Sequence, residues 1–301
     1  MKIGILGLGG VGGFIGAKLA LYYKGSDTQI IFVTRGKNLE TIKHSGLKLQ
    51  SPSGEEVSFP HMVTNDPFEI GRLDLLICCI KSYDLEESIS FLSSCIDENT
   101  FVLPLLNGVD AADRIKSIVP YADVLEGCIY IVSQLIAPGV IKQAGSLCKV
   151  YFGSNTSNPE ALIKIEKMFR NANINAINTS DISSVIWEKF LFISPLATIT
   201  SYLNLGIGEI LSNENHKAEL TALMHELKAI IDAKKIVFQD NLINKNLEKL
   251  YSLPPETTSS MHNDFQRGHK AEVHSLTGIV SDLGKETGVS TPTYDMMLMA
   301  L

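Results

Sequence analysis

The sequence predicts an α/β N-terminal domain built on a doubly wound parallel sheet, followed by an all-α C-terminal domain. Over the first half of the chain, apolar runs alternate with helical patterns, as expected of parallel strands connected by helices. A glycine-rich turn ends the first apolar run and leads directly into a helical pattern. After about residue 181 the strand patterns end and helical patterns dominate. We therefore expect two domains, at residues 1–180 and 181–301, with a substrate cleft between the halves.

The strands of the parallel sheet are expected to be short apolar runs, because helices cover both faces of such a sheet. The runs that fit are Lys2–Gly7, Gln29–Arg35, Leu73–Ile80 and Thr100–Leu106. Antiparallel structure is expected where a turn sequence separates two β patterns. Pro52-Ser53-Gly54 joins Gly46–Ser51 to Glu55–Phe59, and Pro138-Gly139 divides a β segment from about Val124 to Gly153. The first of these hairpins would insert antiparallel structure before the strand at Leu73–Ile80.

Helices are expected where apolar residues recur at helical spacing between proline or polar breaks. One such pattern, Pro159–Ala172, lies in the first domain. The others form the C-terminal domain: Ile182–Tyr202, Asn213–Lys235, Asp240–Leu250, Glu256–Arg267 and Glu272–Thr287. The sequence contains no internal repeat, low-complexity tract or long linker.

The turn after the first strand reads Gly7-Leu8-Gly9-Gly10-Val11-Gly12. A strand that turns on glycines into a helix presents bare backbone N–H groups and the positive end of the helix to a pyrophosphate. A Cβ at these positions would block the tight turn, the approach of the phosphate or the packing of helix on strand. The strand before the motif and the helix after it favour a Rossmann-type dinucleotide site over a purely structural glycine turn.

The residues at the end of the second strand indicate which dinucleotide binds. Sites that prefer NAD usually carry Asp or Glu there, which binds the ribose 2′-hydroxyl. This chain reads Val33-Thr34-Arg35-Gly36-Lys37, with two cations and a hydroxyl where a 2′-phosphate would lie. Arg35 can also stack on adenine and fork onto phosphate oxygens. We therefore expect NADPH/NADP rather than NAD(H); the alternative is that Arg35 and Lys37 are solvated loop charges.

Two polar side chains follow predicted strands at the edge where ligands bind. Lys81 directly follows Ile77–Ile80, and Asn107 directly follows Val102–Leu106. In a doubly wound sheet, ligands bind beyond the carboxyl ends of the strands. The lysine can contact cofactor phosphate, ribose or a substrate anion, and the amide can orient the nicotinamide or the substrate. The alternatives are a solvated lysine and an asparagine that only forms a turn with Gly108.

Lys189 is the only cation in the apolar segment Val185–Ile199. Reduction of a ketone by hydride requires a proton for the developing alkoxide, and withdrawal from water lowers the pKa of a lysine, which makes it a better acid. The alternatives are a lysine whose stem lies over apolar neighbours and one paired with a carboxylate in the core. Further along, Ser260 and Asp264 would share a helix face. Hydroxyls near that helix start could hold a substrate carboxylate, or they could form only an N-terminal capping box.

Bulk composition excludes several classes of protein. The net charge of −7 argues against nonspecific binding to nucleic acid or to an anionic membrane. No apolar run is expected to reach transmembrane length, and the N-terminal segment reads as a strand without a cleavage site, so we expect a cytoplasmic protein. The five cysteines form no Cys-x-x-Cys pair, so we interpret them as reduced packing residues and expect no metal site.

Together, these motifs resemble those of the ketopantoate reductases (2-dehydropantoate 2-reductases), which are NADPH-dependent enzymes of the pantothenate pathway. The matching motifs are GLGGVG at the start, CCIKSYD around Lys81, PLLNGVD around Asn107, IWEKFLF around Lys189, and SSMHNDFQRGHKAEV near the end. The resemblance covers nearly the whole chain. It implies a Rossmann domain, a helical C-terminal domain and a cleft between them.

The resemblance also implies a role for each matching residue. The family's general acid falls on Lys189, which would contact the substrate. The serine that binds the substrate carboxylate falls on Ser260. A second key carboxylate, which would bind the hydroxyl side of the substrate or the cofactor, falls on Glu272. Lys81 and Asn107 match residues near the nicotinamide end of the cofactor, and Asn107 would also bind the substrate.

Arg35 resembles the family's ligand for the 2′-phosphate, but three other positions depart from the family pattern. Many members place asparagines one and two turns after the lysine, where this chain has Ile193 and Ala197. Thr257 also stands where an asparagine often occurs. Losing these amides makes the pocket more apolar, and an apolar pocket discriminates less sharply than one built to bind a hydroxyl.

The resulting hypothesis is NADPH-dependent reduction of a 2-oxo acid, with 2-dehydropantoate giving (R)-pantoate in pantothenate biosynthesis as the leading case. Two alternatives stay open: a paralogous reductase for another, more apolar keto acid, and a non-catalytic NADP(H)-binding sensor. We expect a small-molecule keto acid as the binding partner, with no nucleic acid and no membrane. The oligomeric state is open, and a homodimer is one option.

Overall fold

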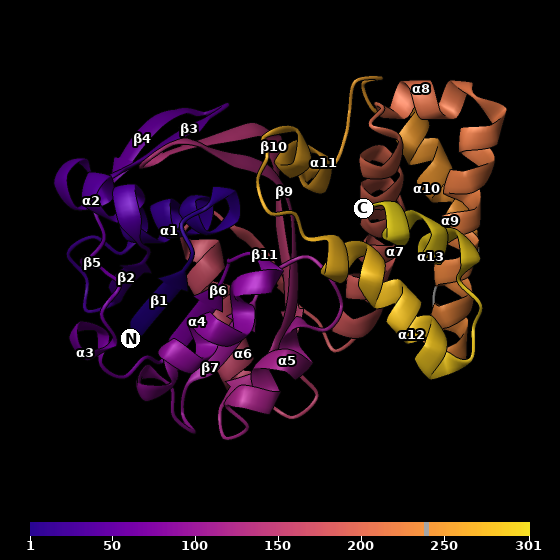
Figure 1. Cartoon of the computed structure of the whole chain (residues 1–301). Coiled ribbons are helices and arrows are strands. Elements are labelled where there is room, and N and C mark those ends of the chain that lie inside the picture. The colour runs from indigo at the N-terminus through magenta and orange to yellow at the C-terminus, as the bar shows by residue number, and fades with distance from the viewer. Residues whose placement is uncertain (238–240) are drawn as a thin grey trace. The chain divides into compact units, whose positions relative to one another are not determined.

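The computed structural model describes residues 1–237 and 241–301 of the chain. The chain divides into two compact units. The first comprises Met1–Leu106 and Asp110–Ile182, and the second comprises Asn107–Val109 and Ser183–Leu301. Strands and helices mix in the first unit, whereas helices and the loops that connect them make up the described part of the second (Figure 1). The predicted fold class, an α/β domain followed by an all-α domain, is confirmed.

The main sheet of the first unit has six parallel strands in the order β5-β2-β1-β6-β7-β8. Their bounds are β1 Lys2–Leu6, β2 Gln29–Val33, β5 Met62–Thr64, β6 Leu75–Cys78, β7 Phe101–Pro104 and β8 Asp123–Val124. All four predicted main strands are present, and each ends before its predicted last residue. The prediction missed β5 and β8, because strands of three and two residues are too short to show a pattern.

Both faces of the main sheet are buried. In β2, Ile30 and Phe32 pack into one apolar core, whereas Ile31 and Val33 pack into another. Helices connect the strands and cover these faces (Figure 1). The helices of the first unit are α1 Gly10–Tyr22, α2 Gly36–Ser45, α3 Pro67–Ile70, α4 Leu85–Phe91, α5 Ala111–Ile118 and, outside the connections of this sheet, α6 Pro159–Asn171, with 3₁₀ turns η1 Ser82–Asp84 and η2 Ser93–Cys95. Alternating side chains on each strand thus produce the doubly wound arrangement.

A second sheet packs beside α1 in the first unit. Its strands run in the order β11-β10-β3-β4, with β9 paired to β10. The bounds are β3 Leu47–Ser51, β4 Gly54–Ser58, β9 Glu126–Ala137, β10 Val140–Gly153 and β11 Asn175–Asn178. Both predicted hairpins, β3–β4 and β9–β10, are confirmed. The prediction did not show that they share a sheet, because β3 pairs with β10, a segment far away in sequence.

The second unit consists of helices packed around one apolar core. They are α7 Ile182–Leu203, α8 Ile207–Ser212, α9 Glu214–Ala233, α10 Leu242–Tyr251, α11 Ser260–Gln266, the π-helical turn η3 His274–Gly278, α12 Ile279–Thr287 and α13 Pro292–Ala300. The helix predicted from Glu256 begins only at Ser260, because the N–H of Thr257 closes a turn on the carbonyl of Pro254. The prediction missed α8 and α13, and Asp240, the predicted start of α10, lies outside the described residues.

Helix α7 corrects one expectation about membranes. It is long and apolar enough to cross a bilayer by length and composition alone, with a mean hydropathy of 1.3 over its most apolar stretch. Of that stretch, 61% is buried inside the protein. Trp187, Phe190 and Leu191 belong to the core of the second unit. We therefore interpret α7 as a core helix, since a helix that is apolar all round is buried in protein as well as in lipid.

Candidate functional site

The glycine turn joins β1 to α1, and three of its glycines, Gly7, Gly10 and Gly12, are required for steric reasons. At Gly10 a Cβ would lie 2.1 Å from the carbonyl oxygen of Ser133. Gly7 has a φ of +87°, and its N–H donates to the carbonyl of Val33 at 3.0 Å. A Cβ on Gly12 would lie 1.9 Å from the carbonyl oxygen of Gly7, so no larger residue fits there. Gly7 and Gly12 hold the first turn of α1 close against the end of β1, as the glycine spacing predicts.

Gly9 differs from Gly7 and Gly12, because a Cβ on it would meet nothing within 4 Å. It is the N-cap of α1, where no side chain caps the helix and no acidic residue occupies the first turn. Leu8 is buried in the core, and Val11 packs against the same core. A pyrophosphate is the kind of ligand that uncapped N–H groups and a helix dipole bind. The open space at Gly9 and the uncapped helix start therefore fit a dinucleotide.

Two polar residues that the sequence did not single out hold this turn in place. Ser133 of β9 donates to the carbonyl of Gly10 at 2.9 Å. Asn38 of α2 donates to the carbonyl of Leu8 at 3.2 Å and accepts from the N–H of Gly139 at 2.7 Å. These partners lie far apart in sequence, so no local pattern could have revealed them.

Arg35 is the N-cap of α2, and 76% of its side chain is exposed. Its Nη2 donates to Oδ2 of Asp84 at 3.1 Å, and Asp84 lies in the turn η1 that follows β6. Lys37 is exposed in the first turn of α2. Arg35 therefore has an ion-pair partner from another strand end, and its role toward a 2′-phosphate stays a prediction.

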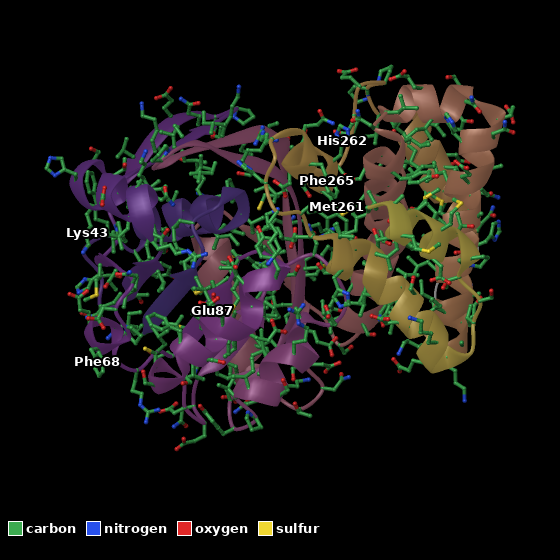
Figure 2. All side chains as sticks on the ribbon, in the orientation of Figure 1. Lys43, Phe68, Glu87, Met261, His262 and Phe265 are labelled. Carbon is green, nitrogen blue, oxygen red and sulfur yellow. The ribbon has the colours of Figure 1, made fainter. Side chains whose placement is uncertain are left out.

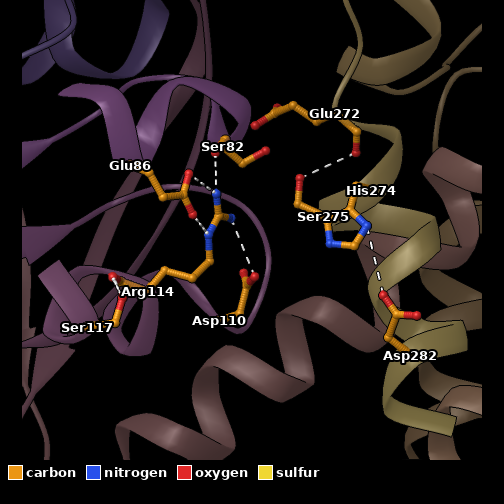
Figure 3. A network of polar contacts seen from close by, with 9 residues as sticks. All are labelled: Ser82, Glu86, Asp110, Arg114, Ser117, Glu272, His274, Ser275 and Asp282. Carbon is orange, nitrogen blue, oxygen red and sulfur yellow. Dashed lines mark hydrogen bonds and ion pairs between the residues drawn. The ribbon is translucent and has the colours of Figure 1, made fainter. Parts of the chain in front are cut away.

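Lys81 is half-buried and directly precedes η1. Arg114 of α5 holds this turn, as Figure 3 shows. The guanidinium of Arg114 donates to the carbonyl of Ser82 at 2.6 Å and to both carboxylate oxygens of Glu86, at 2.6 and 2.9 Å. The hydrogen bond with Glu86 is the main cause that raises the pKa of Arg114. Such a bidentate, charged clamp fixes the backbone next to Lys81.

Asn107 follows β7 in sequence but belongs to the helical unit, together with Gly108 and Val109. Its Oδ1 accepts a hydrogen bond from Nζ of Lys189 at 3.0 Å. Lys189 lies on α7 and is only 8% exposed. The structure therefore brings two predicted site residues together. It contradicts the alternative in which the lysine extends over apolar neighbours into solvent.

Beyond Lys189, hydrogen bonds between buried groups tie α7 to the π-helical turn η3. Ser194 donates to the carbonyl of Leu276 at 2.6 Å and shares a hydrogen bond with the hydroxyl of Tyr294 at 2.7 Å. Thr198 and Thr277 share another at 2.8 Å. A π-helical turn is rare and is often found at functional sites. These bonds hold the turn in one position relative to α7.

Glu272 lies two residues before η3 and is 6% exposed. Its backbone carbonyl accepts from the N–H of Leu276 at 3.2 Å and from the hydroxyl of Ser275 at 3.4 Å (Figure 3). The backbone of Glu272 is therefore fixed to the start of the π-helical turn. Its role toward substrate or cofactor stays a prediction.

Ser260 is exposed at the first position of α11. The preceding Ser259 caps the helix, since its hydroxyl accepts from the N–H of His262 at 3.0 Å. The alternative in which these hydroxyls cap the helix therefore holds for Ser259, although His262 at the third helical position does not supply the reciprocal contact that Glu or Gln makes in a full capping box. Figure 2 labels Met261 and His262 on this short helix, where Met261 is buried in the core. Because Ser259 is the residue that caps the helix, the hydroxyl of Ser260 is not needed for capping. The role of Ser260 as a substrate ligand stays a prediction.

The cysteine side chains lie in or against the apolar cores of the first unit. The five cysteines form no disulfide with one another, and Cys78, Cys95 and Cys128 are buried. Burial raises the pKa of Cys148 to about 11 and the pKa of Cys79 well above its ordinary value. In the described part of the chain, no group of three or more His, Cys, Asp or Glu residues could hold a metal ion.

Two protein-family models match the chain. One, described as "Ketopantoate reductase PanE/ApbA", matches residues 3–157. The other, described as "Ketopantoate reductase PanE/ApbA C terminal", matches residues 181–301. The two matched ranges contain the glycine turn and the segment from α7 to α13 respectively.

Individual relatives cover nearly the whole chain. The "Uncharacterized oxidoreductase YkpB" of Bacillus subtilis (strain 168) is 27% identical over 296 residues, covering 98% of this chain and 96% of the relative. The crystal structure of 2-dehydropantoate 2-reductase from Porphyromonas gingivalis W83 is 32% identical, with a TM-score of 0.85 and coverage of 99% and 97%. A D-mandelate dehydrogenase, solved with NADH and anilino(oxo)acetate, shares the fold at 24% identity and a TM-score of 0.87, with coverage of 100% and 97%. The chain therefore belongs to the ketopantoate reductase family of dinucleotide-binding oxidoreductases.

Proposed function

We propose that the protein reduces a 2-oxo acid with NADPH, and that its substrate is 2-dehydropantoate, which it converts to (R)-pantoate. The observation that carries the proposal is the buried ammonium of Lys189, held at 3.0 Å by the amide oxygen of Asn107. Reduction of a carbonyl by hydride requires a proton donor, and a buried lysine held in place by an amide oxygen can supply the proton. The Porphyromonas gingivalis relative, which is named 2-dehydropantoate 2-reductase, supports the choice of substrate.

The first unit would hold the cofactor. The N–H groups at the start of α1 would bind the pyrophosphate next to Gly9, where the structure leaves space for a ligand. Arg35 would bind the 2′-phosphate, and Lys81 would lie toward the nicotinamide end. Bound NADPH supplies a hydride to the ketone carbon.

The second unit would hold the keto acid. Ser260, exposed at the start of α11, would donate its hydroxyl to the substrate carboxylate. The carboxylate of Glu272 would accept from the substrate hydroxyl, and the hydrogen bond between the carbonyl of Glu272 and the N–H of Leu276 would hold the backbone that carries it. These contacts would orient the ketone and keep water away from it.

Lys189 would supply the proton. As the ketone oxygen gains negative charge, the ammonium would stabilise it and then transfer a proton from Nζ to the alkoxide. The hydrogen bond to Asn107 keeps Nζ in one position, so less orientational freedom is lost in the transition state.

A second candidate is a reductase for a more apolar keto acid. Ile193 packs against the core of the helical unit, and Ala197 is only 2% exposed, so neither presents the amide that many family members have. Without those amides the site is less able to reject substrates that lack a hydroxyl. The D-mandelate dehydrogenase neighbour shows that the fold is not confined to one oxo acid.

The test is the oxidation of NADPH in the presence of 2-dehydropantoate, compared with a panel of branched and aromatic 2-oxo acids and repeated with NADH. A clear kcat/KM advantage for 2-dehydropantoate with NADPH supports the proposal. A higher kcat/KM for a substrate without the hydroxyl selects the second candidate. Tight binding of NADPH without oxidation by any oxo acid would contradict both and leave a cofactor sensor. The cytoplasmic location and a homodimer stay predictions.

A further inference from the structure

We propose that Asp84 is a cofactor-discriminating residue, which weakens the preference for a 2′-phosphorylated dinucleotide by pairing with Arg35. The proposal rests on the proposed function, since it concerns the dinucleotide that the glycine turn would hold. It adds a residue from a different strand end to the recognition of the adenosine ribose.

The sheet topology brings the two charged residues to the same place. β1 lies between β2 and β6, with Leu6 opposite Val33 on one side and opposite Cys78 on the other. The segments that leave β2 and β6 therefore flank the glycine turn that leaves β1. Arg35 follows β2 and Asp84 follows β6, and their side chains meet at 3.1 Å.

Other polar groups at the end of β2 already have partners. The amide of Asn38 donates to the hydroxyl of Thr34 at 3.3 Å and to the carbonyl of Leu8 at 3.2 Å. The positive charges at this strand end belong to Arg35 and Lys37. The negative charge of Asp84 offsets that of Arg35. A phosphate monoester carries between about one and a half and two negative charges near neutral pH, so it is sensitive to such a neighbour.

The same carboxylate favours a dinucleotide without the 2′-phosphate. Sites that prefer NAD bind the ribose 2′-hydroxyl with Asp or Glu at the end of the second strand. The end of β2 has none, but Asp84 supplies a carboxylate beside Arg35 from the neighbouring strand. The pair therefore offers a cation to a phosphate and an acceptor to a hydroxyl, which predicts a modest preference for NADPH rather than a strict one.

The exposure of the pair indicates how the discrimination works. The side chains are 76% and 31% exposed, so holding them together contributes little to stability. Arg35 can leave Asp84 for a phosphate at small cost. The remaining effect of Asp84 is the repulsion between its charge and the phosphate, and salt screens such repulsion between exposed groups.

The experiment measures the dissociation constants of NADPH and NADH for the wild type and for Asp84→Asn, from the fluorescence of the bound nicotinamide. The substitution keeps the size of the side chain and removes its charge. We expect NADPH to bind about three- to tenfold more tightly and NADH to bind equally or up to about threefold more weakly, as for one charge acting at close range through water. The gain for NADPH should shrink at high salt.

Glu55→Gln is the matched control, because it breaks another exposed ion pair of the same unit, Lys48–Glu55 at 3.0 Å. It should leave both dissociation constants unchanged. Equal shifts for both nucleotides in Asp84→Asn, or no shift in either, would overturn the role of Asp84 while leaving the reductase proposal intact. A wild-type protein that binds neither nucleotide would overturn the proposed function itself, and with it this inference.

Discussion

Nζ of Lys189 donates to Oδ1 of Asn107 at 3.0 Å, although the two residues are 82 positions apart. Asn107 comes from the loop after β7, and Lys189 comes from the first turns of the buried helix α7. Both belong to the helical unit. A lysine withdrawn from water in this way needs polar partners, because burying a charged group without them is costly.

Replacing Lys189 by Met should separate binding from chemistry. Met keeps the length and apolar stem of the side chain but cannot donate a proton, so kcat should fall by about 10²–10⁴. The dissociation constant for NADPH should change less than about twofold, because Lys189 would contact the keto acid rather than the nucleotide. Single-turnover kinetics and a fluorescence titration measure the two quantities. A variant with near-normal kcat would refute the role of Lys189 as general acid.

The glycine turn allows a matched pair of substitutions. Gly9→Ala places a Cβ in open space at a φ of −73°, so the melting temperature should stay nearly unchanged while affinity for NADPH falls at least about tenfold. Gly12→Ala places a Cβ 1.9 Å from the carbonyl of Gly7, so it should destabilise the fold by about 2 kcal/mol or more. Thermal unfolding and nucleotide titration distinguish the two. Unaltered affinity in Gly9→Ala would place the pyrophosphate elsewhere.

The buried contacts between Ser194, Tyr294 and Leu276 should appear as coupled stability effects. Ser194→Ala leaves the carbonyl of Leu276 and the hydroxyl of Tyr294 without their partner, so it should cost about 2–3 kcal/mol. Tyr294→Phe removes only one donor and should cost about 1 kcal/mol. Urea unfolding of both single variants and the double variant provides a double-mutant cycle. Strictly additive losses would show that the two hydroxyls are not coupled.

Arg114 should act as a positioning residue for the turn that carries Lys81. Arg114→Met removes the clamp on Ser82 and Glu86, and we expect the KM for NADPH to rise about three- to tenfold with a smaller change in kcat. Arg114→Lys should rescue little, because an ammonium cannot make the bidentate contact. Lys116→Met on the same helix is the control, since Lys116 pairs only loosely with Asp113 at 3.9 Å. Full rescue by Lys would mean that charge alone matters.

The cysteines should react slowly and with a steep pH dependence. Burial raises the pKa of Cys148 to about 11, above the ordinary value of 9.0, so less thiolate is present at any pH below 11. At pH 8 we expect alkylation about a hundredfold slower than for a free cysteine, because the thiolate is the reactive form. The rate should rise about tenfold for each pH unit up to pH 10. Mass spectrometry after timed alkylation, with urea-unfolded protein as the control, measures it; fast reaction of the folded protein at pH 8 would contradict the burial of Cys148.

Local sequence determined much of this protein. The alternation of apolar runs and helical patterns predicted an α/β domain, and the helical patterns after residue 181 predicted an all-α domain. Periodicity allows this because it indicates which face of a helix or strand is buried. The glycine spacing predicted the turn between β1 and α1, because the positive φ of Gly7 and the contact of Gly12 with the carbonyl of Gly7 are local requirements. Lys189 is the single cation of the apolar segment Val185–Ile199, and it is buried as that pattern indicates.

Only the tertiary structure decided which distant residues meet. No pattern near Asn107 shows that it belongs to the helical unit, and none near Arg35 shows that Asp84 pairs with it. The pairing of β3 with β10 and the π-helical turn before α12 were likewise unpredicted. The physical reason is that a helix or turn depends on neighbouring residues, whereas partners far apart in sequence are selected by how the whole chain buries its apolar surface and satisfies its buried polar groups.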